Sequence, residues 1–228
     1  SVIKSKSQLP QFIQKRINHL NKQLPKRKAT IIACNKTEDN PGSIKTAYFS
    51  CIQQAVIEKH QQHFITDLKT EKQVSFGVVR MANIVPCVAL TEFLINAEWG
   101  EDTEIRVMAY HSQQVMLLRS EQEAHLDQIL KRNKPNGGIE NKLIKLYLEQ
   151  SSAKNMIFIV VATPVEEVGR DHDFDWAVVE PSSFRSIIQL AGRVLRHRED
   201  MPEHPNIAIM QYNLKALLHA KEKPVYTQ

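Results

Sequence analysis

The 228-residue sequence has few of the features that mark secreted, membrane or zinc-ribbon proteins. Its three cysteines, Cys34, Cys51 and Cys87, are odd in number and widely spaced, which favours reduced thiols in a cytoplasm over a disulfide scaffold. No Cys-x-x-Cys pair is present, so a zinc ribbon is excluded. No apolar run approaches the roughly 20 residues that cross a bilayer. With 42% hydrophobic residues the chain can still build a core, so we expect a cytoplasmic globular protein with no membrane partner.

A complete nucleotide-hydrolysing site is also missing. A phosphate-binding loop needs Gly-x-x-x-x-Gly-Lys followed by Ser or Thr, and the nearest stretch, Gly42–Thr46, lacks the second glycine before its lysine. No Asp-Glu-x-His motif follows any expected strand. The first residues, Ser-Val-Ile-Lys, are neither a signal peptide nor an initiator methionine, and we expect them to be the cut end of a longer chain.

Acidic residues are absent from the first 37 positions, which hold nine lysines and arginines. The whole chain has a net charge of +5, so the remainder is net negative. Such a basic segment suits either a nucleic-acid backbone or a solvated linker or helix face, and the sequence leaves both open.

The apolar pattern predicts an α/β fold, in which a parallel sheet carries helices on both faces. Before residue 74 we expect helices over 9–24 and 47–68 and a strand over 29–34. The later stretch predicts strands over 74–81, 104–110, 156–161, 176–180 and 206–212, and helices over 83–97, 119–132, 139–150 and 184–196. Ligands of such folds lie at the carboxyl ends of the strands.

Two arginines, Arg193 and Arg196, stand three residues apart, and the expected helix would place both on one face. Two permanently charged guanidinium groups side by side suit a chain of phosphates. Gly192 would keep that face open for close approach. The alternatives are a basic surface patch or pairing with carboxylates.

Several motifs together resemble superfamily 2 helicases, with the stretch from Ala162 to Asp171 as motif V and that from Gln189 to Arg196 as motif VI. Within that superfamily the chain is similar to the CRISPR-associated helicase-nuclease of type I systems, and most similar to its type I-F branch. The stretches that carry this narrower resemblance are Gly77–Asn83, Tyr110–Gln113, Val165–Asp173, Trp176–Ser182 and Gln189–His197. The resemblance covers about residues 74–213 and implies a division into a basic, mainly helical inter-lobe segment (1–73), a second RecA-like lobe (74–214) and a tail (215–228).

In that family ATP, with Mg²⁺ held by the first lobe, lies between two RecA-like lobes. The resemblance implies that Arg193 and Arg196 are arginine fingers and that Gln189 bonds near the γ-phosphate. Gly169, Asp171 and Gly192 would belong to the nucleotide-binding motifs, with Asp171 accepting a ribose hydroxyl or steadying an arginine. Many helicases have a glycine before the last arginine, where this chain has Leu195.

The resemblance also implies contacts to single-stranded DNA, at the ends of strands. Thr163 and nearby backbone amides match phosphate-contacting positions, and Asn83, His111 and Ser112 match further ones. Each has a plainer alternative. Thr163 and Asn83 could cap helices, and His111 could be a hydrogen-bonded residue at a strand end.

Residue spacing offers two candidate metal sites. Asp171, Asp173 and Asp175 alternate as in an EF-hand, but Trp176 and Ser182 stand where that loop needs glycine and glutamate, so a loop stabilised by aspartates is favoured. His60 and His63 lie three apart on an expected helix without a third ligand, which favours a polar helix face.

The implied function is that of the C-terminal helicase lobe of an ATP-dependent single-stranded DNA translocase, a helicase-nuclease of CRISPR interference and antiviral defence. The family's nuclease motifs are also missing. Because the phosphate-binding loop and the Asp-Glu-x-His motif are absent, we expect the chain to be inactive as an ATP hydrolase by itself. Implied partners are single-stranded DNA, the first lobe of the same polypeptide, a crRNA-guided surveillance complex and an adaptation integrase. The alternative is a non-catalytic module of the same fold that docks DNA or a protein.

Overall fold

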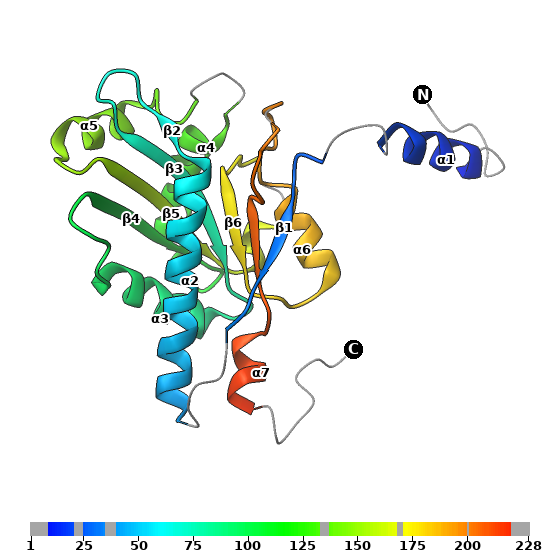
Figure 1. The fold of residues 1–228 in the computed structure, drawn as a ribbon, viewed down its shortest axis with the longest axis horizontal. Helices are drawn as coiled ribbons and strands as arrows, with labels where there is room; N and C mark the ends of the chain where they lie inside the picture. The colour runs from blue at the N-terminus through cyan, green and yellow to red at the C-terminus, as the bar shows by residue number, and fades with distance from the viewer. Residues whose placement is uncertain are drawn as a thin grey trace.

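The computed structural model describes residues 9–20, 25–34, 40–132, 137–167, 171–199 and 201–219. In these residues one sheet of seven strands forms the centre of the fold, in the order β1-β7-β6-β3-β5-β4, with β2 antiparallel to β3 (Figure 1). All other pairings are parallel. The strands are β1 (Ala29–Ile32), β2 (Ile65–Thr66), β3 (Gln73–Arg80), β4 (Thr103–Tyr110), β5 (Asn155–Ala162), β6 (Trp176–Val179) and β7 (Ile207–Met210).

Helices cover both faces of this sheet, as expected for a RecA-like lobe (Figure 1). One face packs against α2 (Pro41–His63), α3 (Ile84–Asn96) and α7 (Leu214–His219), and the other against α4 (Met116–Leu130), α5 (Lys142–Gln150) and α6 (Phe184–Ala191). Alternate side chains of β5 point to the two faces of the sheet: Ile159 packs in the hydrophobic core on the first face and Val160 in the core on the second. Since both faces are covered, the strand reads as one continuous apolar run.

The central strands end together. Arg80, the last residue of β3, pairs with Ala162, the last residue of β5, and Tyr110, the last of β4, pairs with the same Ala162. The loops that follow these strands therefore leave from one carboxyl edge of the sheet, where ligands of parallel sheets bind.

The expected break at residue 73 does not coincide with a break in the structure. Strand β1 is an edge strand of the same sheet, paired with β7, and α2 contributes buried side chains such as Tyr48 and Ile52 to the core. Residues 29–73 thus build part of the lobe. Helix α1 (Leu9–Leu20) lies apart from the sheet, and the side chains of residues 10–18 are exposed (Figure 1).

Among the predicted helices, two differ most from the bounds in the structure, while those predicted over 119–132 and 139–150 differ at their ends by at most two or three residues. Helix α2 begins at Pro41, where Asn40 accepts a hydrogen bond from the Gly42 amide, rather than at residue 47, and ends at His63 before β2. Helix α6 ends at Ala191 rather than at residue 196. Among the described residues, no helix is both long and apolar enough to span a bilayer.

Candidate functional site: an arginine turn beside the carboxyl edge

Arg193 and Arg196 do not share a helix face, which corrects the prediction from their spacing. Helix α6 ends before them, and Leu195 between them has φ of +46°, a left-handed conformation that stops helical continuation. Residues 192–199 form a turn, here called the arginine turn. Val194 pairs with Phe174, whose amide donates to Arg193 O at 2.8 Å and whose carbonyl accepts from Leu195 N at 3.0 Å.

One carboxylate organises the far half of the turn. Asp173, which is fully buried, accepts the backbone amides of Arg196 and His197, each at 3.1 Å. Arg198 adds a side-chain contact, with Nη2 at 2.8 Å from Asp173 Oδ1. The predicted role of Asp173 in a loop stabilised by aspartates is therefore what the geometry presents.

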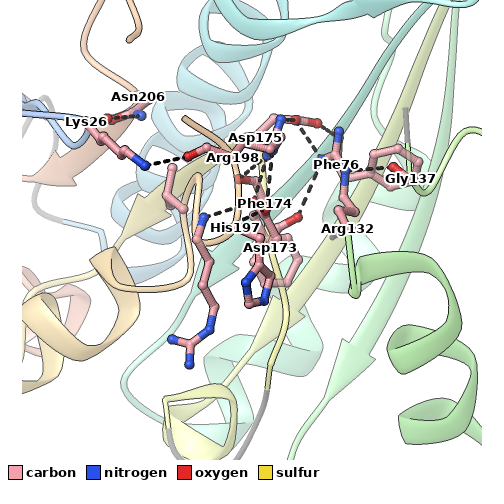
Figure 2. Close-up of polar contacts among 12 residues, drawn as sticks. Lys26, Phe76, Arg132, Gly137, Asp173, Phe174, Asp175, His197, Arg198 and Asn206 are labelled. Carbon is pink, nitrogen blue, oxygen red and sulfur yellow. Dashed lines mark hydrogen bonds and ion pairs between the residues drawn. The ribbon is translucent and has the colours of Figure 1, made fainter. Parts of the chain in front are cut away.

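Asp175 lies between two guanidinium groups, those of Arg132 and Arg198 (Figure 2). Arg132 Nη1 lies 2.7 Å and Arg198 Nη1 2.6 Å from Asp175 Oδ1, and the Phe76 amide donates to Oδ2 at 2.7 Å. Burial by itself would raise the pKa of Asp175, but the two arginines and this amide hold the pKa below its ordinary value. The same carboxylates raise the pKa of Arg198 against the opposing effect of its burial. Arg132 and Arg198 were missed in the sequence, where nothing pairs them with residues tens of positions away.

Arg193 is buried and faces the segment that follows β5. Its Nη2 donates to Glu167 O at 3.0 Å, whereas its Nε is buried without a hydrogen-bond partner among the described residues. Burial lowers the pKa of Arg193, and the nearby charge of Arg196 lowers it further. The arginine is thus held by a backbone carbonyl, and no carboxylate of the described residues forms an ion pair with it.

Arg196 is the exposed member of the pair. Its Nε donates to Asp171 Oδ1 at 2.7 Å, and the two side chains are 38% and 44% exposed. This hydrogen bond lowers the pKa of Asp171, an effect to which His197 contributes. The contact matches the expectation that Asp171 steadies an arginine, and it also matches the alternative that the arginines pair with carboxylates.

The other nucleotide-motif residues lie near the turn or outside the described part. Gln189 lies in the last turn of α6, and Gly192 caps that helix, with its amide donating to Ile188 O at 3.0 Å. A Cβ added at Gly192 would meet only carbonyl oxygens of its own helix, at 3.2 and 3.6 Å. Gly169 lies outside the described residues.

The four predicted DNA-contacting residues gather at the carboxyl edge. Asn83 follows β3 and is exposed, and its side chain makes no capping hydrogen bond to α3. His111 and Ser112 follow β4, Ser112 exposed, while His111 has a buried Nδ1 without a partner among the described residues.

Thr163 follows β5 and is buried, with its amide donating to Tyr110 O at 3.1 Å. The Glu166 amide donates to Thr163 O at 3.2 Å, so both of these N–H groups are already bonded within the chain. The capping alternative for Thr163 receives only positional support, because its side chain makes no capping bond.

A buried ion pair joins the carboxyl edge to the arginine turn. Arg80, at the end of β3, donates Nε to Glu167 Oε1 at 2.9 Å and Nη2 to Ser186 Oγ in α6 at 2.6 Å. Glu167 also accepts from Ser186 Oγ, and its carbonyl holds Arg193. The two groups of predicted residues are therefore separate in position but share one linking segment, residues 163–167.

In the structure, His60 of one candidate metal site makes other contacts. His60 is buried and contacts Ser75 Oγ at 2.8 Å and Asn155 Oδ1 at 3.1 Å, so it faces the sheet rather than lying on a polar helix face. The part of the chain that the structure describes contains no group of three or more metal-ligating side chains.

With this geometry established, similarity to known proteins decides the family. The C-terminal family of the CRISPR-associated nuclease/helicase Cas3 matches residues 73–199, more than half of the chain. The chain belongs to this Cas3 C-terminal family. It is 41% identical over 210 residues to the CRISPR-associated nuclease/helicase Cas3 subtype I-F/YPEST of Pectobacterium atrosepticum, covering 90% of this chain and 19% of that protein. It is 33% identical to the protein of the same name from Pseudomonas aeruginosa, again covering 90% and 19%. The chain thus spans about a fifth of the length of these Cas3 relatives.

Solved Cas3 structures share the fold. The structure of T. fusca Cas3-ATP has a TM-score of 0.55 at 14% identity, covering 84% of this chain and 19% of that one. T. fusca Cas3-AMPPNP has a TM-score of 0.53 at 12% identity, covering 90% and 20%. At such identities the match concerns the fold alone, and it agrees with the predicted RecA-like sheet. The type I-F resemblance found from sequence motifs is also confirmed.

Proposed function

We propose that this chain is the second helicase lobe of an ATP-dependent single-stranded DNA translocase, a helicase-nuclease that unwinds DNA in CRISPR interference and antiviral defence. Family membership supports the helicase-nuclease assignment, and the printed name of the T. fusca structure, Cas3-ATP, supports ATP as the nucleotide. The single observation that carries the proposal is the fixed arginine turn, joined through Arg193 and Glu167 to the segment after β5.

Arg196 is the arginine placed to meet a phosphate directly, because its guanidinium is exposed and its partners among the described residues are an exposed carboxylate and one backbone carbonyl. Arg193 is buried and donates one nitrogen to Glu167 O, so we expect it to act on a phosphate mainly through the electrostatic field of its charge. Both would neutralise charge that develops as the γ-phosphoryl group is transferred. Gln189, Gly169, Asp171 and Gly192 complete the proposed nucleotide side, and Mg²⁺ would be held by the first lobe.

The carboxyl edge is the proposed DNA side. Exposed Asn83 and Ser112 offer polar side chains, and His111 and Thr163 lie at the same edge. Contacts to the sugar-phosphate backbone carry no sequence preference, which suits stepping along a strand. A crRNA-guided surveillance complex and an adaptation integrase are the further partners that we propose from the type I-F likeness.

The proposal is tested with Arg193→Ala and Arg196→Ala in the full-length protein that carries this lobe. Each change is expected to lower ATP turnover about a thousandfold or more, since arginine fingers supply that much, while single-stranded DNA binding is retained. Arg185→Ala, which removes an exposed arginine from α6, is the matched control and should leave both unchanged. If this lobe is instead a docking module without a motor function, the ATP turnover of the full-length protein should be unaffected by all three changes.

A further inference from the structure

The segment before β1 reaches the arginine turn from the opposite end of the sequence. Lys26 Nζ donates to Arg198 O at 2.7 Å, and Arg27 Nε donates to Val194 O at 2.8 Å. Asn206 fixes the segment, since its Nδ2 donates to Lys26 O at 2.9 Å (Figure 2). Its Oδ1 accepts from Lys28 N at 3.1 Å. The basic start of the chain is thus tied to the turn by specific bonds.

Val194 is the residue through which this contact matters. It lies between Arg193 and Arg196 and is fully buried, and a buried carbonyl must find a donor. The peptide group that Arg27 holds links Val194 to Leu195, the residue with φ of +46°. A non-glycine residue in that conformation persists only where its surroundings fix it. The direction in which the chain leaves toward Arg196 is set at this peptide.

We propose that Arg27 is a positioning residue for the arginine pair: by donating its Nε–H to Val194 O it fixes the peptide group from which Arg196 is presented. The inference rests on the proposed function for its effect on ATP turnover, although its structural part stands independently.

The electrostatic surroundings of Arg27 argue that the contact is not incidental. Burial lowers the pKa of Arg27 and the charge of Arg196 lowers it further, while Asp173 acts in the opposite direction. Placing a second positive charge near Arg196 is unfavourable by itself. The bond to Val194 O and the carboxylate of Asp173 offset that repulsion, and a bound phosphate would offset it further.

Two uncharged variants of similar length separate the hydrogen bond from the charge. In Arg27→Gln the amide nitrogen Nε2 stands as many bonds from Cα as Nε does in arginine, so it can donate to Val194 O. Arg27→Met keeps the length and removes the donor. Arg27→Lys keeps the charge but places a carbon where Nε was. Lys28→Ala is the matched control, because Lys28 Nζ donates to Pro202 O at 2.8 Å, beyond the turn.

The first measurement is amide hydrogen exchange in this chain, followed at Arg196 and His197, with Val160 in β5 reporting global opening. We expect exchange at the two turn amides to rise about tenfold in Arg27→Met and to stay near wild type in Arg27→Gln and Lys28→Ala, with Val160 unchanged. Equal exchange in the Met and Gln variants, or an equal effect of Lys28→Ala, overturns the proposal. If Arg27→Met weakens the whole fold, the Val160 amide also exchanges faster. The proposal then requires a larger increase at Arg196 and His197 than at Val160, and equal increases overturn it.

The second measurement is ATP turnover in the full-length protein. A displaced finger acts on the transition state, so Arg27→Met should lower kcat about tenfold or more with little change in KM, and Arg27→Gln should restore it. Activity retained by Arg27→Lys but lost in Arg27→Gln would assign the effect to charge and overturn the positioning role. Arg196→Ala is measured alongside: if it leaves kcat unchanged, the proposed function fails, whereas the exchange result still decides the role of Arg27.

Discussion

Asp171 accepts a hydrogen bond from Arg196 at 2.7 Å, which joins two residues that the resemblance predicted in separate helicase motifs. Both partners are exposed, so the pair contributes little to folding but restricts where the guanidinium points. An arginine already held in one direction loses less conformational freedom when it meets a phosphate. Removing this contact should therefore change how Arg196 is oriented without much change in the stability of the fold.

Asp171→Asn is expected to change the free energy of unfolding by less than about 1 kcal/mol, because exposed ion pairs contribute no more than that. In the full-length protein it should lower ATP turnover severalfold, since Arg196 loses its charged partner. Urea unfolding and steady-state ATP turnover measure the two effects. Glu140→Gln, which breaks another exposed pair, that of Glu140 with Lys145, is the control and should alter neither. Unchanged turnover in Asp171→Asn would show that Asp171 does not steady a finger.

Asp175→Asn should be far more damaging to the fold. It leaves the buried guanidiniums of Arg132 and Arg198 without their shared negative charge, and breaking a buried pair costs about 3 kcal/mol or more. Urea unfolding compares it with Asp102→Asn, an exposed aspartate whose side chain takes no part in this network. A loss below about 1 kcal/mol would contradict the central role given to Asp175.

The same carboxylate predicts a pH dependence. The pKa of Asp175 is lowered in the folded state, so the unfolded chain binds a proton more readily and stability rises with pH in the acidic range. Its contribution is fully present above the unfolded aspartate pKa of about 3.9 and is lost as pH falls below it toward the folded value. The stability difference between wild type and Asp175→Asn should therefore be largest near neutral pH and shrink in acid. A difference that grows as pH falls would reverse the sign.

The sequence predicts the sheet well because the strands are marked locally. The continuous apolar run of β5 is visible in the sequence, and residues just beyond strand ends, such as Asn83 and His111, must share one edge of a parallel sheet. The place of β1 is not predictable in this way. Its four residues identify a strand, but nothing in them identifies β7, about 180 residues later, as the partner.

The arginine turn shows the opposite limit. The three-residue spacing of Arg193 and Arg196 fits a helical period, but the helix ends at Ala191, so the prediction that both lie on one helix face is wrong. Leu195 adopts the left-handed conformation that glycine prefers, at the position where the helicase resemblance led us to expect glycine, so the residue type gave no sign of this conformation. The sequence does not reveal the role of Arg198, because that role depends on ion pairs with Asp173 and Asp175 that form only in the folded chain.

Gly77 in β3 is the position where the core tolerates least. A Cβ there would lie 2.1 Å from the ring of Trp176, a fully buried residue whose Nε1 donates to Ser75 Oγ at 3.0 Å. Gly77→Ala should lower the free energy of unfolding by about 3 kcal/mol or more, because the buried Trp176 ring cannot move away without disturbing the residues packed around it. Gly100→Ala, at φ of +86° in open space, is the control and should cost only about 1 kcal/mol from backbone strain. Thermal or urea unfolding of the two variants checks the order, and equal losses would refute it.

Asn83 distinguishes a helix cap from a DNA contact. Its exposed side chain makes no capping bond, so Asn83→Ala should leave the free energy of unfolding nearly unchanged. Asn141 begins α5 with a side chain that accepts from the Leu143 amide at 2.9 Å, and Asn141→Ala should cost about 1 kcal/mol. Fluorescence anisotropy with a labelled single-stranded oligonucleotide, measured in the full-length protein, should reverse this order. We expect Asn83→Ala to weaken binding severalfold, because it removes a polar group from the edge where β3, β4 and β5 end, and Asn141→Ala to leave binding intact. If Asn83→Ala does not weaken DNA binding, Asn83 is not part of the proposed DNA-contacting surface. If Asn83→Ala lowers the free energy of unfolding, Asn83 acts as a helix cap.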